Sequence, residues 1–262
     1  MYQGEHRGAT LSVVIIAKDE ADRIARCLAS VEAIADEIIV LDSGSSDDTV
    51  SIARQFTPDV HETDWPGYGK QKQRAVSMAT GDWVLSLDAD EELTVGMREE
   101  VNAIVCGNGD HDAYKVRWAV MLLDKQLNYG ANSRYVLRLF RRGSADFTDA
   151  DVHEAVKLNP GTSLGKLTSR LRHYSMRDFD HMMQKYDHYA SLGARMRHEK
   201  GRTGGGLFGA AFRGVFVFLQ LYIFRLGFLD GGPGFLIAVM HSQYAFNKYA
   251  GLWYLNQQDR MK

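Results

Sequence analysis

The sequence has few cysteines, little net charge and no repeats, and each of these shortages excludes a class of protein or site. Its two cysteines, Cys27 and Cys106, lie too far apart for a cysteine metal site, and their small number suits a reducing compartment. The formal net charge is only −2 at pH 7, so no nucleic-acid partner is expected. No repeat or low-complexity tract is present, and the polar start MYQGEHRG predicts no secretory signal.

The chain does have enough apolar sequence for a sizeable core. Hydrophobic residues make up 45% of its 262 residues, which suits one large domain or a domain with an appendage. The runs 11–17 and 37–41 are continuously apolar and β-branched, which is typical of strands buried on both faces of a parallel sheet. With shorter strands at 60–62 and 83–87 and helix-type spacing between them, the pattern predicts four strand–helix units with right-handed crossovers.

Acidic residues follow two of these strands. Asp42 ends the strand at 37–41, and Asp88 and Asp90 follow the strand at 83–87. Ligands of open α/β sheets bind outside the carboxyl ends of the strands, so these side chains could face one ligand. Two such carboxylates suit a hard divalent cation, which could hold a diphosphate. The alternative is a solvated loop in which Glu91 and Glu92 only favour the start of the next helix.

The middle of the chain follows a different pattern. The spacing predicts a helix over 94–105, strands with one wetted face at 113–122 and 135–141, and a weaker strand at 166–173. A second polar cluster lies between the last two strands, at Asp149, Asp151, His153 and Glu154. We expect residues 1–175 to form one domain and residues 176–262 a helical extension.

The extension carries a long apolar run. A helix rich in basic residues is expected at 178–198, and the run 207–224 that follows contains Arg213. A spanning helix needs about 20 apolar residues, and a central arginine costs a few kcal/mol. We therefore expect this run and a final aromatic helix at 235–254 to lie in the interface of an anionic membrane. The alternative is a pair of core helices or a dimer interface.

Three motifs together resemble a known family. The segments LSVVIIAKDE, IIVLDSGSSDDT and GDWVLSLDADEE are similar, in order and in placement at strand ends, to the inverting glycosyltransferases of family 2. The resemblance covers about residues 1–160 and implies a GT-A fold, a Rossmann-like mixed sheet flanked by helices. Val152-His153-Glu154, Lys185 and the turn LDGGPG resemble, more loosely, the subgroup that adds a hexose to the lipopolysaccharide inner core, typically β-1,4-glucose on the first heptose.

The resemblance implies a donor, an acceptor and a location. The donor would be a UDP-sugar, with UDP-glucose expected, and the acceptor a lipid-linked saccharide of the lipopolysaccharide core or a related one. The enzyme would be metal-dependent, with Mg²⁺ or Mn²⁺ as cofactor. It would work as a peripheral protein at the cytoplasmic face of the inner membrane.

The same resemblance assigns donor-site roles to individual residues. Ala17 and Glu20 would contact the nucleoside, Asp42 would accept a hydrogen bond from uracil N3–H, and Lys72 would lie near the base. In the motif that follows the fourth strand, Asp88 would bind ribose hydroxyls, Ala89 would line the donor site, and Asp90 would coordinate the metal.

An inverting transfer also needs a base on the acceptor hydroxyl, opposite the leaving group. The family often places an aspartate there, whereas this sequence offers Asp151 and Glu154. We expect Glu154 to be the base and His153 to contact a phosphate or the metal; the alternative is a structural pair of His153 and Glu154. Arg138 and Arg141 could steady the diphosphate or an anionic acceptor, although arginines at strand edges are often simply solvated.

Two other functions fit parts of the sequence. A nucleotidyltransferase on a similar sheet would normally carry a glycine-rich loop with a basic residue after the first strand, whereas Lys18-Asp19-Glu20 contains no glycine. A non-catalytic membrane-associated scaffold would keep the fold without the chemistry.

Overall fold

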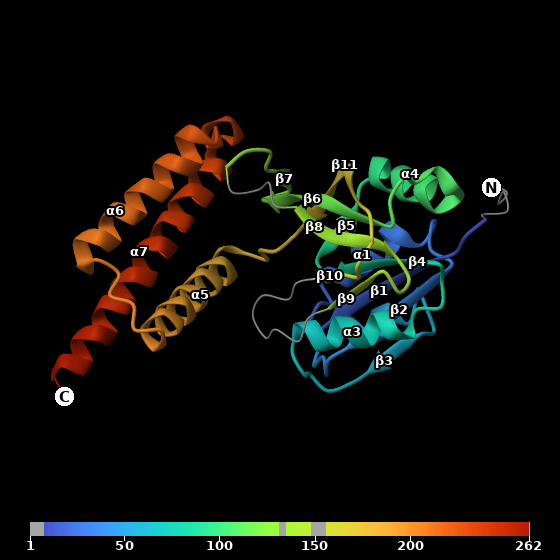
Figure 1. Cartoon of the computed structure of the whole chain (residues 1–262), viewed down its shortest axis with the longest axis horizontal. Coiled ribbons are helices and arrows are strands. Elements are labelled where there is room, and N and C mark those ends of the chain that lie inside the picture. Colours follow the sequence, from blue (N-terminus) through green and yellow to red (C-terminus); the bar gives the residue numbers. More distant parts are fainter. Residues whose placement is uncertain (1–7, 131–134, 148–155, 262) are drawn as a thin grey trace. The chain divides into compact units, whose positions relative to one another are not determined.

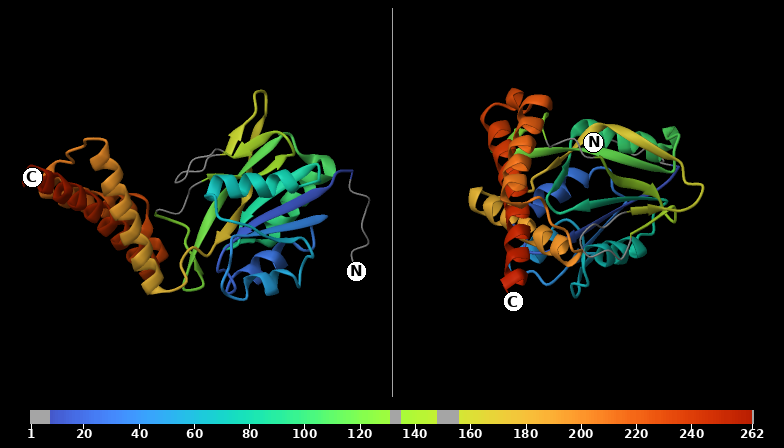
Figure 2. Two further views of the ribbon diagram at one scale, coloured as in Figure 1. Left: turned by 90° about the horizontal axis from the view of Figure 1, so that it is seen from below. Right: turned by 60° about the vertical axis from the view of Figure 1, so that its left-hand side comes forward.

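The computed structural model describes residues 8–130, 135–147 and 156–261. The chain divides into two compact units, a sheet unit of Met1–Trp118 and Tyr135–His173 and a helical unit of Ala119–Arg134 and Tyr174–Lys262 (Figure 1, Figure 2). The excursion Ala119–Arg134 thus groups with the C-terminal helices. The predicted boundary at residue 175 stays a prediction about independently folding domains.

Four parallel strands form the first half of the sheet, as the sequence predicts. β1 (Leu11–Ala17) lies between β2 (Glu37–Asp42) and β4 (Trp83–Asp88), and β3 (Val60–Glu62) pairs with β2. Ala17 pairs with Asp42 and Ile16 with Asp88, so the three strands end at one edge of the sheet. Asp42 and Asp88 therefore flank β1 at its carboxyl end.

Layers on both faces of the sheet explain the unbroken apolar sequence of β1. Val13 and Ile15 belong to one core with α1 (Ile24–Val31) and α4 (Val95–Ala103), whereas Val14 and Ile16 belong to a second core with α3 (Tyr68–Met78). A short helix, α2 (Thr49–Ala53), follows β2. The buried face of α1 is the predicted one: Ile24, Cys27, Leu28 and Val31.

Antiparallel pairs build the other half of the sheet. The order continues from β4 through β8 (Tyr135–Arg141), β6 (Ala113–Leu122), β11 (Leu164–His173) and β5 (Glu91–Leu93). β7 (Lys125–Gln126) pairs with β6, and β9 (Ala145–Phe147) pairs with β10 (Val156–Leu158). The predicted mixed sheet flanked by helices is confirmed, whereas strands of two or three residues are too short to show a periodicity in the sequence.

β5 excludes the alternative that was left open for the acidic run. Glu91 and Glu92 do not start a helix; they pair with His173 and Arg172 of β11. α4 begins only after Thr94, whose side chain accepts a hydrogen bond from the backbone N–H of Met97, and a π-helical turn (Ile104–Asn108) continues it.

The helical unit consists of three long helices. α7 (Gly232–Met261) packs against α5 (Phe179–Glu199) and against α6 (Gly206–Leu219), which a π-helical turn (Gln220–Phe224) extends. A 3₁₀ turn (Gly227–Asp230) joins α6 to α7. The carboxylate of Asp230 in this turn is buried and accepts hydrogen bonds from the backbone N–H groups of Asn128 and Tyr129. The LDGGPG motif therefore anchors the segment around Asn128 and Tyr129 to the helices.

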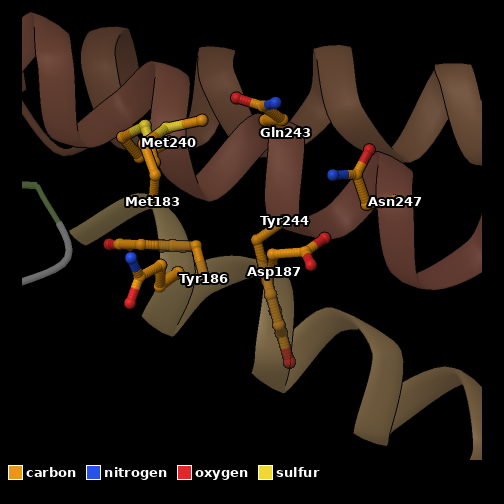
Figure 3. A pocket seen from close by; sticks show the side chains of 8 residues that line it. Met183, Tyr186, Asp187, Met240, Gln243, Tyr244 and Asn247 are labelled. Atoms are coloured by element: carbon orange, nitrogen blue, oxygen red, sulfur yellow. The ribbon is translucent and has the colours of Figure 1, made fainter. Parts of the chain in front are cut away.

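A hollow of 280 Å³ lies between α5 and α7 (Figure 3). Its lining combines apolar, aromatic and polar groups: Met183, Gln184, Tyr186, Asp187, Met240, Gln243, Tyr244 and Asn247. Burial lowers the pKa of the neighbouring His241 to about 4, so this imidazole is neutral at pH 7.

Candidate functional site

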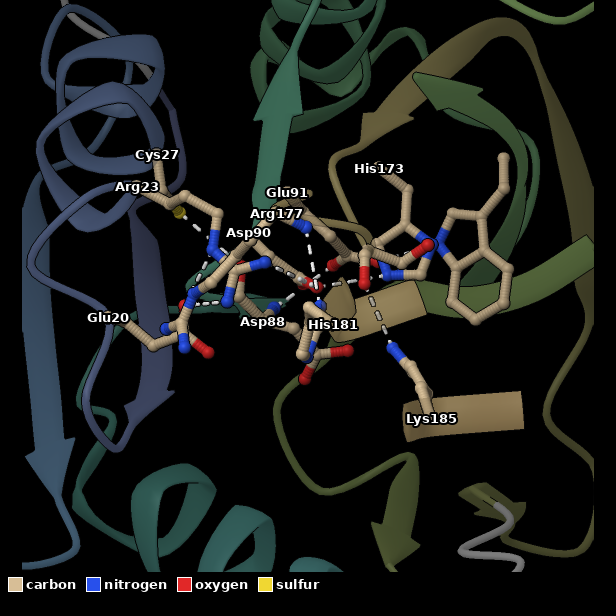
Figure 4. A network of polar contacts seen from close by, with 12 residues as sticks. Glu20, Arg23, Cys27, Asp88, Asp90, Glu91, His173, Arg177, His181 and Lys185 are labelled. Carbon is tan, nitrogen blue, oxygen red and sulfur yellow. Dashed lines mark hydrogen bonds and ion pairs between the residues drawn. The ribbon is translucent and has the colours of Figure 1, made fainter. Parts of the chain in front are cut away.

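The carboxyl end of β4 leads into a dense cluster of charged side chains (Figure 4). Asp88 ends the strand, Ala89 and Asp90 form the turn, and Glu91 opens β5. The turn brings three carboxylates into one place, and basic side chains from α3, β8, β11 and the start of α1 meet them.

Two cations hold Asp88. Lys72 Nζ of α3 lies 2.7 Å from its Oδ1, and Arg138 Nη2 of β8 lies 2.5 Å from its Oδ2. Burial alone would raise the pKa of Asp88, but the charges of Arg138 and Lys72 outweigh it and hold the pKa well below its usual range. Among the predicted donor-site residues, Asp88 thus contacts both Lys72 and Arg138 directly, and Asp88 is ionised at neutral pH.

Glu91 lies underneath this pair. Its side chain has no exposed surface, and its Oε1 accepts hydrogen bonds from Arg138 Nη2 and from Trp118 Nε1, each 2.6 Å away. Its Oε2 accepts the backbone N–H of Asp88 at 3.0 Å. Burial raises the pKa of Glu91, although Arg138 opposes the shift. Glu91 therefore fixes both the side chain of Arg138 and the backbone of Asp88.

Asp90 pairs with a histidine that the sequence analysis does not single out. His173 Nε2, at the end of β11, lies 3.3 Å from Asp90 Oδ2, and Arg23 Nη1 lies 3.9 Å from the same oxygen. The His173 ring stacks on Trp118 with centroids 4.6 Å apart. Burial alone would lower the pKa of His173, but the carboxylate of Asp90 outweighs it and raises the pKa. Burial alone would likewise raise the pKa of Asp90, and His173 lowers it.

The cluster has an accessible layer above a buried one. The side chains of Asp88, Asp90 and His173 keep 28%, 16% and 16% of their surface exposed. Those of Lys72, Arg138 and Glu91 keep 5% or less. The accessible side chains can therefore exchange their present partners for a ligand. The buried side chains cannot reach a ligand and serve to position the accessible ones.

Asp42 occupies its own turn. Its Oδ2 accepts the backbone N–H groups of Gly44 and Ser45, its Oδ1 accepts the Ser45 hydroxyl, and the residue is 1% exposed. This arrangement leaves Oδ1 one further lone pair. The predicted bond to uracil N3–H stays a prediction, and it requires the Gly44 turn to open access to Oδ1.

The smaller predicted contacts lie near the same edge. Ala17 ends β1, and its carbonyl accepts the backbone N–H of Ser43. Glu20 precedes α1 and forms an ion pair with Arg23. Ala89 is buried between the two aspartates. Their predicted contacts with the donor stay predictions.

Arg141 does not join this cluster, and its predicted contact with the diphosphate or an anionic acceptor stays a prediction. β8 runs antiparallel to β4 and pairs Leu139 with Leu85 but Arg141 with Trp83. Arg138 therefore lies toward the carboxyl end of β4. Arg141 lies beside Trp83 at the start of β4, and Trp83 is roughly 16 Å along the strand from Asp88. There Arg141 lies over the Trp83 ring at 4.6 Å and pairs with Asp112.

The candidate base residues lie outside the described residues. Asp151, His153 and Glu154 all fall within residues 148–155, so their predicted roles as base and as metal or phosphate contact stay predictions.

The donor set at the strand edge fits a hard divalent cation. Asp90 offers carboxylate oxygens, the ligands that hard divalent cations prefer. Within residues 8–130, 135–147 and 156–261, no group of three acidic, histidine or cysteine side chains forms a complete metal cage. Mg²⁺ sites commonly use one or two carboxylates and take their other ligands from substrate phosphates and water, so a complete protein cage is not required.

Sequence reasoning missed Arg23, Glu91, Trp118 and His173. Arg23 precedes the apolar face of α1, and His173 ends a strand dense in arginine, so neither stood out from its neighbours. For Glu91, the sequence suggests only the alternative of favouring the start of the next helix. Only the pairing of β5 with β11, which are far apart in sequence, brings His173 beside the acidic turn.

Comparisons with known proteins give several matches. Residues 12–132 match the family model described as glycosyl transferase family 2. An uncharacterized glycosyltransferase of Rickettsia typhi is 32% identical over 95% of this chain and 89% of that protein. A lipopolysaccharide core biosynthesis glycosyltransferase of Rhizobium meliloti is 30% identical over 90% of this chain and 89% of that protein. The solved glucosyl-3-phosphoglycerate synthase of Mycobacterium tuberculosis with Mg²⁺ and UDP is 29% identical over 42% of this chain and 44% of that chain, with a TM-score of 0.37.

Proposed function

The chain belongs to glycosyltransferase family 2, and from this membership we propose that it transfers a hexose with inversion from a UDP-sugar to a lipid-linked saccharide. UDP-glucose is the proposed donor, and a sugar of the lipopolysaccharide core is the proposed acceptor. The likeness to the Rhizobium meliloti protein, whose name refers to lipopolysaccharide core biosynthesis, supports this class of acceptor.

One observation carries the proposal: accessible carboxylates lie at the carboxyl edge of the sheet, next to a layer of buried charged side chains. Asp88 and Asp90 are partly exposed; Lys72, Arg138 and Glu91 hold Asp88, and His173 and Arg23 pair with Asp90. In a salt-bridge cluster with a purely structural role, exposure of Asp88 would add no stability. An edge that binds a diphosphate and its counter-ion needs such access.

Each side of the cluster has a proposed task. Asp88 hydrogen-bonds the ribose hydroxyls, and Lys72 and Arg138 fix its orientation. Asp90, with His173 beside it, would hold Mg²⁺ or Mn²⁺, which when bound neutralises charge on the departing UDP. Glu91 is a positioning residue: it accepts hydrogen bonds from Arg138 and from the Asp88 backbone, and so it orients Asp88.

In the proposed transfer, the acceptor hydroxyl oxygen attacks the anomeric carbon on the face opposite UDP. The carbon–oxygen bond to UDP breaks as the new glycosidic bond forms, which inverts the configuration. A base takes the hydroxyl proton, and Glu154 is the proposed base, with Asp151 as the other candidate.

The test is UDP release from a panel of UDP-sugars with heptose-containing core lipid, with Mn²⁺ present or chelated. We expect release to be fastest with UDP-glucose and to require the metal. Asp90→Ala should abolish release, whereas Glu92→Gln, a neighbour that pairs with Arg172, should leave it intact. Full activity of Asp90→Ala would remove the proposed metal role.

Two further variants identify the base. Glu154→Gln should retain UDP-glucose binding and lose transfer, and Asp151→Asn serves as its matched control. Loss of transfer in Asp151→Asn alone would move the base to Asp151. Pyrophosphate release from UTP and a sugar phosphate, without UDP release, would instead indicate a nucleotidyltransferase.

A further inference from the structure

α6 carries a wide apolar face that no described residue covers. Its large side chains point outward at helical spacing, and Phe208 is 94% exposed and Phe212 72% exposed. The π-helical turn continues the same pattern, so the exposed apolar set runs the length of the segment: Phe208, Phe212, Val215, Phe216, Leu219, Ile223 and Phe224. An exposed apolar surface of this extent marks an interaction site in a folded protein.

The opposite face of α6 is built for close packing. Ala210 and Gly214 are buried, and a Cβ added at Gly214 would lie 3.3 Å from the backbone oxygen of Ser242 in α7. Small residues thus face the protein and large apolar residues face outward, which is the reverse of a helix in a water-soluble core.

The one charged residue within this run does not interrupt the exposed face. The Arg213 guanidinium lies 4.2 Å from the centre of the Tyr249 ring of α7. Its Nη1 donates to the backbone oxygens of Gly204 and Gly209, at 2.8 and 3.1 Å. The charge is therefore satisfied on the α7 side, and the outward side of α6 remains apolar.

Basic residues flank the face at both ends. Arg195, Lys200 and Arg202 are exposed before α6, and Arg225 is exposed after it. The acids at the first end are Glu199 and Asp259, and Asp259 is paired with His198 at 3.1 Å. Exposed cations beside an apolar face complement the headgroups of an anionic bilayer.

We propose that this face of α6 docks on an anionic lipid bilayer, with the helix lying along the interface. Among the described residues, Gly206–Phe224 is the one helical segment long and apolar enough to cross a membrane. A crossing hairpin of α6 and α7 would however carry Arg213 and Lys248 into the hydrocarbon, which is costly. A helix with one apolar face and one packed face suits the interface.

The test is flotation of the full-length protein with vesicles of phosphatidylcholine, with or without phosphatidylglycerol. The wild type should float with the anionic vesicles and at least several-fold less with the neutral ones. Phe212→Glu with Phe216→Glu should lower binding by at least about tenfold. The matched control, Phe179→Glu with Tyr189→Glu, places the same charges at exposed aromatic positions of α5 and should bind as the wild type does.

Three outcomes would overturn the proposal. One is equal flotation of the wild type and the Phe212/Phe216 variant. Another is that the wild type does not float with vesicles but sediments as a dimer without lipid, while the Phe212/Phe216 variant sediments as a monomer. A second copy of the chain would then cover the face. The third is resistance of the bound protein to alkaline carbonate, which indicates a crossing helix. If circular dichroism shows that the double variant is unfolded, Phe208→Ser decides instead: a several-fold fall in flotation supports docking, and no change overturns it.

Discussion

Arg138→Met removes the cation that Asp88 and Glu91 share. Glu91 has no exposed surface, and Arg138 donates to it at 2.6 Å and to Asp88 at 2.5 Å. Removing one partner of a buried ion pair typically costs about 3 to 5 kcal/mol, because the remaining charge is left without compensation. Since Lys72 still pairs with Asp88, most of this cost should fall on Glu91.

The pH dependence of this cost has a definite sign. The folded-state pKa of Glu91 is already raised, and loss of Arg138 should raise it further. A raised carboxyl pKa means that the folded chain binds more protons than the unfolded chain, so stability falls as pH rises through that window. The penalty of Arg138→Met should therefore be larger at pH 8 than at pH 5.

Urea unfolding of four proteins measures the effect: wild type, Arg138→Met, Glu91→Gln and the double variant. Because Glu91→Gln removes the charge that Arg138→Met would strand, the double variant should lose about 2 kcal/mol less than the sum of the single losses. The reasoning is refuted if Arg138→Met costs below about 1 kcal/mol at pH 8, or if the two single costs simply add.

Three further predictions rest on separate contacts. The pKa of His241 is about 4 in the fold against 6.5 when unperturbed, so the unfolded chain binds the extra proton between these values. Stability should fall by up to about 3 kcal/mol as pH drops from 6.5 to 4, and His241→Gln should flatten this dependence in urea titrations; an unchanged slope contradicts it. Lys72→Met should raise the Kd for UDP-glucose by roughly tenfold or more, because Asp88 loses one of its two cations; an unchanged Kd in calorimetry would exclude Lys72 from the donor site. Asp230→Asn should cost about 1.5 to 3 kcal/mol, since an amide oxygen replaces the carboxylate that accepts two backbone N–H groups; a thermal melt matching the wild type would show that this anchor is dispensable.

The sequence was sufficient for the parallel half of the sheet because its signals there are local. The unbroken apolar run of β1 reflects two cores, and the spacing in α1 reflects one. Parallel strands that end in register bring Asp42 and Asp88 to one edge, so the site's location followed from chain order and the hydrophobic pattern.

The composition of the site depends on pairings that no local pattern encodes. The antiparallel register of β8 against β4 brings Arg138 into the cluster and sends Arg141 to the opposite end. The pairing of β5 with β11 brings His173 to Asp90 and turns Glu91 into a buried support. These residues lie far apart in the sequence or among similar polar neighbours, and only long-range strand pairing brings them together.

The central claim is that the acidic end of β4 binds a cation together with the pyrophosphate of a UDP-sugar. Calorimetric titration of UDP-glucose into the wild type and into Asp90→Asn, with Mn²⁺ present or chelated, tests it most directly. We predict strong heat for the wild type only with Mn²⁺, and a Kd raised by about 100-fold in Asp90→Asn. Equal affinity with and without Mn²⁺, or equal affinity of the two proteins, would contradict the claim.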